Sequence, residues 1–130
     1  MNNNIELKMK YYAPIILRIS IAIVFLWFAL SQFIAPIEWT GYLPDWTSRT
    51  FMPQTTFIML NATFETIFGL MLLLGVFTRI SAALLGLHLI AITIAVGYNS
   101  IGVRDLGLSI AALSIALNGS DGWSLMKNKL

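Results

Sequence analysis

Long apolar runs separated by short polar breaks dominate the sequence, and this pattern predicts membrane-spanning helices. Each run is close to the roughly 20 apolar residues that a helix needs to cross a bilayer. The predicted spans cover residues 15–35, 57–77, 80–98 and 101–117, with a long loop over residues 36–56. We therefore predict an all-α protein, a polytopic bundle of four transmembrane helices, with residues 1–130 forming a single membrane domain.

Composition excludes several classes of protein. Of the 130 residues, 58% are hydrophobic and only 11% are charged, whereas soluble domains carry about 25% charged residues. Mean hydropathy is +0.79. The net charge of +2 is not gathered on a basic face with interleaved aromatics, so nucleic acid is not an expected partner. With no cysteine and one histidine, the sequence predicts no metal site made by the protein alone and no covalently bound cofactor.

The first run has two interpretations. Pro14 suits the first turn of a helix, which predicts that the first span begins there. The alternative is a signal peptide, because basic residues precede an apolar stretch. Against that alternative, the run is too long for the apolar part of a signal peptide, contains Arg18 and lacks a small-residue cleavage site before Pro36.

Basic residues predict the orientation of the bundle. One face holds Lys8, Lys10, Arg18, Arg79, Lys127 and Lys129, and the other holds Arg49 and Arg104. Cytoplasmic loops are enriched in Lys and Arg, so both termini are predicted to be cytoplasmic and residues 36–56 extracytoplasmic. Arg79 is interpreted as an orientation signal, and Arg18 as a residue whose charged end extends to the cytoplasmic interface.

Aromatic residues mark the membrane interfaces. Trp39, Tyr42 and Trp46 lie in the long loop and Trp123 lies near the C-terminus, where rings with a polar group favour the headgroup region. We expect all four to be interfacial anchors. The alternative for the loop is a lid over an opening in the bundle.

Polar residues inside the apolar runs are the candidate functional residues. Glu65 and His88 fall near the middle of two neighbouring spans, and their depths differ by about one helical turn. An ionisable group at that depth is costly unless it faces protein or water. The predicted polar pocket, in the outer half of the bundle, consists of Gln32, Asn61, Glu65, His88, Arg104 and Asp105.

Structural alternatives exist for the same residues. Glu65 and Arg104 could form a buried ion pair that fixes helix register without chemistry. His88 could be a hydrogen-bonded core histidine, and Asp105 could stabilise a helix N-terminus.

Small and polar residues predict which face of each helix is buried. By helical spacing, the inward stripes are Arg18, Ala22, Ala29 and Gln32; Asn61, Glu65 and Gly69; His88, Ala91 and Ala95; and Asp105, Ser109, Ala112 and Ala116. The third span has a second small stripe, Ala82, Gly86, Thr93 and Gly97. If His88 faces inward, that second stripe would be free for a partner subunit.

The segment FETIFGLMLLLGVFTRISAALL resembles the signature of the DoxX family, with Glu65, Gly69, Gly75 and the Thr78-Arg79 pair in place. The segments IVFLWFALSQF, GYLPDW and GYNSIGVRDLGL are similar to one branch of that family. One departure is that many members have Gly and Lys where this chain has Ala29 and Gln32, so no role of that lysine carries over. The resemblance implies a multi-pass protein of the bacterial or archaeal cytoplasmic membrane with both termini inside.

For function the resemblance implies two classes. Some DoxX proteins are subunits of quinone-linked oxidoreductases or accompany quinone-detoxifying systems, which favours a small redox-associated subunit that binds a quinone or another lipophilic ligand. More distant relatives are cargo receptors or chaperones, which favours a non-enzymatic scaffold or assembly factor. We expect a non-catalytic subunit, with quinone-linked oxidoreduction as the reaction if it is active. The expected partners are the lipid bilayer and either a second copy of the chain or an oxidoreductase subunit.

Overall fold

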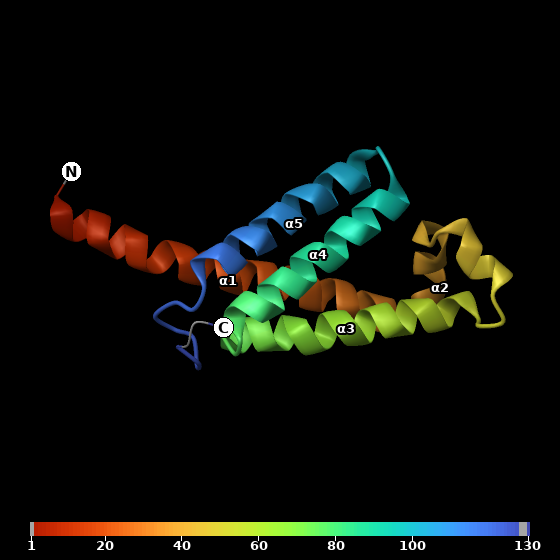
Figure 1. Cartoon of the computed structure of the whole chain (residues 1–130), viewed down its shortest axis with the longest axis horizontal. Helices are drawn as coiled ribbons and strands as arrows, with labels where there is room; N and C mark the ends of the chain where they lie inside the picture. The colour runs from red at the N-terminus through yellow and green to blue at the C-terminus, as the bar shows by residue number, and fades with distance from the viewer. Residues whose placement is uncertain (1, 128–129) are drawn as a thin grey trace.

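A computed structural model describes residues 2–127 and 130 and shows long helices, two of which, α1 and α3, are connected by a long loop (Figure 1). The elements are α1 (Asn3–Ile34), α2 (Pro36–Trp39), η1 (Thr40–Tyr42), η2 (Asp45–Arg49), α3 (Gln54–Leu74), α4 (Thr78–Val96) and α5 (Ser100–Asn118). Four of these, α1, α3, α4 and α5, are long and apolar enough to cross a membrane. The prediction of an all-α bundle with four spans is confirmed.

Helix α1 begins earlier than predicted, at Asn3 instead of near Pro14. Asn2 caps it, with the side-chain oxygen accepting from the backbone N–H of Asn4 at 3.3 Å. One turn further on, Glu6 and Lys10 pair at 2.6 Å. A cap and an i,i+4 ion pair both favour helix, so the polar lead is helical and Pro14 lies inside α1.

The helices form two antiparallel pairs, α1 with α3 and α4 with α5 (Figure 1). The pairs meet near the α3–α4 turn and diverge toward α2. Glycine permits close packing within each pair, because a Cβ at Gly86 would lie 2.9 Å from Leu113 and one at Gly69 would lie 3.0 Å from Leu26. The predicted stripes of α1 and α5 contain most of the buried residues of these helices, and the stripe of α3 contains two of its buried residues, Glu65 and Gly69.

The predicted stripe of α4 needs correction. Ala91 and Ala95 are exposed, whereas Ala82 and Gly86 are buried where α4 meets α5. His88 is half-buried and also faces protein. The proposal that Ala82 and Gly86 are free for a partner subunit is wrong, because α5 already covers them.

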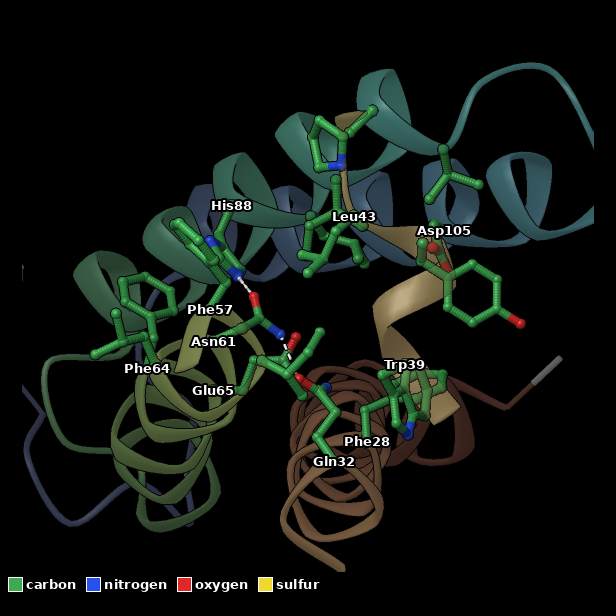
Figure 2. Close-up of a pocket in the computed structure, with 18 of the residues that line it drawn as sticks. Phe28, Gln32, Trp39, Leu43, Phe57, Asn61, Phe64, Glu65, His88 and Asp105 are labelled. Atoms are coloured by element: carbon green, nitrogen blue, oxygen red, sulfur yellow. Dashed lines mark hydrogen bonds between the residues drawn. The ribbon is translucent and has the colours of Figure 1, made fainter. Parts of the chain in front are cut away.

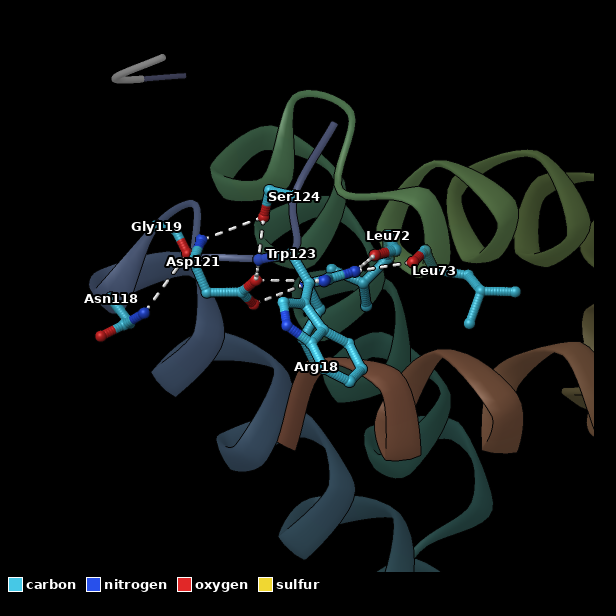
Figure 3. Close-up of polar contacts among 8 residues, drawn as sticks. All are labelled: Arg18, Leu72, Leu73, Asn118, Gly119, Asp121, Trp123 and Ser124. Atoms are coloured by element: carbon cyan, nitrogen blue, oxygen red, sulfur yellow. Dashed lines mark hydrogen bonds and ion pairs between the residues drawn. The ribbon is translucent and has the colours of Figure 1, made fainter. Parts of the chain in front are cut away.

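A buried arginine, Arg18, connects the chain segments at the end of the bundle that carries the termini (Figure 3). Arg18 is only 1% exposed and donates to both carboxylate oxygens of Asp121, at 2.7 and 3.1 Å. Its Nη1 also donates to the backbone carbonyls of Leu72 and Leu73 at 2.8 and 2.6 Å. These four residues are called the Arg18 cluster below. The prediction that Arg18 extends to the interface is wrong, since Asp121 provides an internal partner.

The segment after α5 packs against the α3–α4 turn and closes this end. Leu125 and Met126 donate backbone hydrogen bonds to Leu74 and Gly75 at 3.0 and 3.1 Å. Arg79, interpreted from sequence as an orientation signal, donates to the carbonyls of Ala116 and Leu117 at the end of α5. Lys129, which entered the charge count, lies outside the described residues.

Candidate functional site

A cavity of about 450 Å³ opens where the two helix pairs diverge, at the end of the bundle opposite the termini (Figure 2). All four long helices line it, and η1 and η2 contribute from the long loop. All six residues of the predicted polar pocket lie on its wall: Gln32, Asn61, Glu65, His88, Arg104 and Asp105. The structure thus brings together side chains from α1, α3, α4 and α5.

Four of these side chains form one continuous series of hydrogen bonds, called the polar chain below. His88 Nε2 donates to Asn61 Oδ1 at 2.5 Å. Asn61 Nδ2 donates to Gln32 Oε1 at 2.7 Å, and Gln32 Nε2 donates to Glu65 Oε2 at 3.0 Å. Figure 2 shows the line that these residues make across α4, α3 and α1. Glu65 and His88 are therefore linked through two amides.

Helical spacing explains how α3 contributes two members of the polar chain. Asn61 and Glu65 are four residues apart, so both project from the same face of α3. Glu65 is only 3% exposed, and Gln32 is buried to the same extent. A buried carboxyl group needs hydrogen bonds, and here the partner that the structure provides is a neutral amide.

The alternative of an ion pair between Glu65 and Arg104 is not what the structure shows. Among the described residues, Arg104 pairs with Asp105, whose Oδ1 accepts from Nε at 3.1 Å and from Nη2 at 3.0 Å. The guanidinium carbon lies 5.1 Å from the centre of the Phe28 ring. The neighbouring carboxylate and this ring hold Arg104 at the cavity wall, where its side chain remains 49% exposed.

The long loop covers the cavity with aromatic side chains. Trp39, Tyr42 and Trp46 all line it, and Trp39 packs between Phe28 and Tyr42 at centroid distances of 5.9 and 5.8 Å. Tyr42 and Trp46 keep large exposed fractions. This position agrees with the lid alternative, and their role as membrane anchors stays a prediction.

Trp123 lies at the other end of the bundle. Its ring packs edge-on against Tyr12 with the centroids 6.3 Å apart. It is exposed and does not line the cavity, so its role as an interfacial anchor also stays a prediction.

The sequence analysis did not identify the phenylalanines of the cavity. Phe28, Phe57 and Phe64 line the wall, and the Phe64 ring lies 4.4 Å from the His88 ring at an angle of 33°. Spacing could have identified two of them: Phe28 and Phe57 each precede an amide of the polar chain by four residues.

Metal binding has no support in the described part of the chain, where no group of three or more His, Cys, Asp or Glu side chains could hold an ion. The cavity instead offers hydrogen-bonding groups within an aromatic and aliphatic wall. Such a wall suits an uncharged ring with polar substituents and an apolar tail.

In a comparison with known families, the model of the DoxX family matches residues 13–98, which is more than half of the chain. The matched range includes the four residues of the polar chain and ends before Arg104 and Asp105. No curated protein and no solved structure matches the chain.

Proposed function

This chain belongs to the DoxX family, and on that basis we propose that it is a small membrane subunit or accessory protein of a quinone-linked redox system. In this proposal the cavity binds the head group of a quinone or a similar lipophilic ligand. We also propose that the protein lies in the cytoplasmic membrane of a bacterium or archaeon. The observation that carries the proposal is the polar chain, which lies on the wall of a largely apolar cavity within a four-span bundle.

The cavity wall supports this ligand class. Six aromatic rings line it, provided by Phe28, Trp39, Tyr42, Trp46, Phe57 and Phe64. Flat rings pack well against other rings in offset or edge-on arrangements. His88 and Glu65 lie at the two ends of the polar chain and are the groups that would contact ligand oxygens. Proton exchange with a head group would involve the same two residues.

The chain's own residues supply binding groups and no electron carrier. It has no cysteine, so a partner protein or a diffusible reductant would deliver the electrons of any quinone reduction. This division of roles is why we propose a non-catalytic subunit.

A titration tests the proposal. Purified protein in detergent is titrated with a ubiquinone or menaquinone analogue, and the affinity is compared with that of Glu65→Gln and His88→Ala. Loss of a hydrogen bond to the ligand should weaken binding by about tenfold. Ile67→Ala and Leu87→Ala are matched controls, because these exposed side chains lie on α3 and α4 near the tested residues. Equal affinities in the wild type and both test variants would reject the proposal.

One observation favours a non-enzymatic scaffold as the second candidate. The polar chain joins the side chains of α1, α3 and α4 to one another, as hydrogen bonds between membrane helices do when they serve packing alone. For a scaffold, Glu65→Gln leaves ligand affinity unchanged and alters stability or the recovery of a partner protein. The same set of variants therefore separates the two functions.

A further inference from the structure

The polar chain has a direction, and that direction is fixed at one end. An ionised carboxylate can only accept hydrogen bonds, so Gln32 must direct its NH₂ group toward Glu65. The Gln32 oxygen then accepts from Asn61, and the Asn61 oxygen accepts from His88. His88 is therefore protonated at Nε2, and its other ring nitrogen, Nδ1, is left as an acceptor.

The same geometry permits the opposite direction. If Glu65 gains a proton at Oε2, it can donate to the Gln32 oxygen after that amide turns by half a rotation. The Gln32 NH₂ group then donates to the Asn61 oxygen, and the Asn61 NH₂ group donates to Nε2 of His88. His88 must now carry its proton on Nδ1.

Reversal keeps every hydrogen bond of the polar chain. Within the described residues, the side chains of Gln32 and Asn61 make the bonds of this chain, and the Asn61 side chain also interacts with Glu65. Along the polar chain, both directions contain the same number of bonds between the same pairs of residues. The two forms differ in two ways. Glu65 carries one additional proton in the second form, and the proton of His88 moves from Nε2 to Nδ1 by exchange with water.

His88 Nδ1 belongs to a side chain that lines the cavity. Nδ1 has no hydrogen-bond partner among the described residues. In the same part of the chain, the buried side-chain nitrogen or oxygen atom that lacks a hydrogen-bond partner is Thr78 Oγ1, not Nδ1. Nδ1 is therefore not buried, and His88 lines the cavity. The atom that changes between acceptor and donor can thus be reached by a ligand.

The geometry points to a switch in which the protonation of Glu65 sets the hydrogen-bonding character of His88 Nδ1 through the amides of Gln32 and Asn61. With Glu65 ionised, Nδ1 accepts a hydrogen bond; with Glu65 protonated, Nδ1 donates one. The consequence for ligands rests on the proposed function. The form with ionised Glu65 selects a hydroxyl group, as in a quinol, and the form with protonated Glu65 selects a carbonyl oxygen, as in a quinone.

Other groups that titrate or carry charge face the same cavity. They are Tyr42 from η1 and the bonded pair Arg104 and Asp105 from α5, whereas α1 contributes the amide of Gln32 and no charge. A pH effect on His88 must therefore be assigned by substitution. The chain has a single histidine, so nitrogen NMR of protein labelled with ¹⁵N-histidine reports on His88 alone.

The experiment follows the two ring nitrogens of His88 as the pH is lowered, with no ligand present. We expect the protonated and unprotonated signals to exchange between Nε2 and Nδ1 as Glu65 titrates. Glu65→Gln should abolish this exchange, and Asn61→Leu should abolish it while leaving Glu65 in place. If Asn61→Leu does not fold, Gln32→Met interrupts the same chain. Tyr42→Phe and the double variant Arg104→Gln/Asp105→Asn should retain the exchange, although the pH of its midpoint can move in the double variant because the charge of Asp105 acts on Glu65.

Three results would overturn the switch: no exchange at any pH, an exchange that persists in Glu65→Gln or Asn61→Leu, or protonation of both nitrogens together.

A second titration then compares a quinone analogue with its quinol. We expect the affinity ratio of the two to change by about tenfold between the two forms of the switch. Tautomer exchange without binding of either would reject the proposed function and retain the switch, and binding without exchange would do the reverse.

Discussion

The two ends of the bundle use buried polar residues in different ways. At the end with the termini, Arg18 and Asp121 form a charged pair in which each side chain is 1% exposed, and both have further hydrogen-bond donors or acceptors nearby. At the other end, Glu65 is equally enclosed but receives a neutral amide, beside an open cavity. The first arrangement fixes helices together, and the second leaves hydrogen-bonding capacity for a ligand.

The largest expected effect comes from removing the cation of the Arg18 cluster. Arg18→Leu removes the cation that pairs with Asp121 and the donor that Arg18 provides to the Leu72 and Leu73 carbonyls. Breaking a buried ion pair by removing one partner costs about 3–5 kcal/mol of unfolding free energy. Unfolding in mixed micelles with increasing SDS measures this loss, with Lys10→Met, in an exposed pair, as the control. If the two variants unfold alike, the Arg18 cluster does not hold this end together.

Gly75 provides the next largest effect at the same end. Its φ of +72° is unfavourable for other residues, and a Cβ would lie 2.5 Å from the Ser124 backbone. Gly75→Ala should therefore cost about 1–3 kcal/mol. Gly107→Ala is the matched control, because no atom lies within 4 Å of its Cβ position. The same SDS titration measures both, and equal stabilities would contradict the close packing of the C-terminal segment.

Acid should weaken the Arg18 cluster. Burial raises the pKa of Asp121, but the hydrogen bonds from Arg18 and from the Trp123 backbone N–H outweigh it and hold that pKa below the ordinary value of 3.8. A depressed pKa means that the folded protein binds fewer protons than the unfolded chain, so stability is lost as the pH falls through the folded pKa. In Asp121→Asn, acid unfolding curves should no longer show this loss of stability at low pH. The control Asp45→Asn, in the exposed loop, should still show it.

The smallest effect on stability is expected at the cavity. Glu65→Gln keeps the size of the side chain and an oxygen that accepts from Gln32, so the free energy of unfolding should change by about 1 kcal/mol or less. A loss as large as that of Arg18→Leu in the same SDS titration would mean that both ends serve stability, which would contradict the contrast drawn between them.

Much of the cavity follows from the sequence. Four apolar runs fix the number of spans, and the spacing of Asn61 and Glu65 places both on one face of α3. Because His88 and Glu65 lie at similar depths on neighbouring spans, their approach could be predicted. The binding of a ligand there stays a prediction.

Charge partners could not be predicted. Arg18 and Asp121 are 103 positions apart, and no local pattern links an arginine in the first span to an aspartate beyond the last one. An ion pair of Arg104 with Glu65 was one alternative, since both lie in the outer half of the predicted bundle, yet the adjacent Asp105 is the partner of Arg104. Residue spacing predicts which residues share a face, but it does not decide between competing partners across helices.

Fluorescence quenching tests most directly whether ligand binds at the cavity end. Two variants each keep one tryptophan of the four, either Trp39 at the cavity or Trp123 beside Tyr12 at the opposite end. A quinone analogue should quench Trp39 in a saturable manner and quench Trp123 only in proportion to its concentration in the micelle. Saturable quenching of neither tryptophan, or the same quenching curve for both, would contradict a ligand site in the cavity.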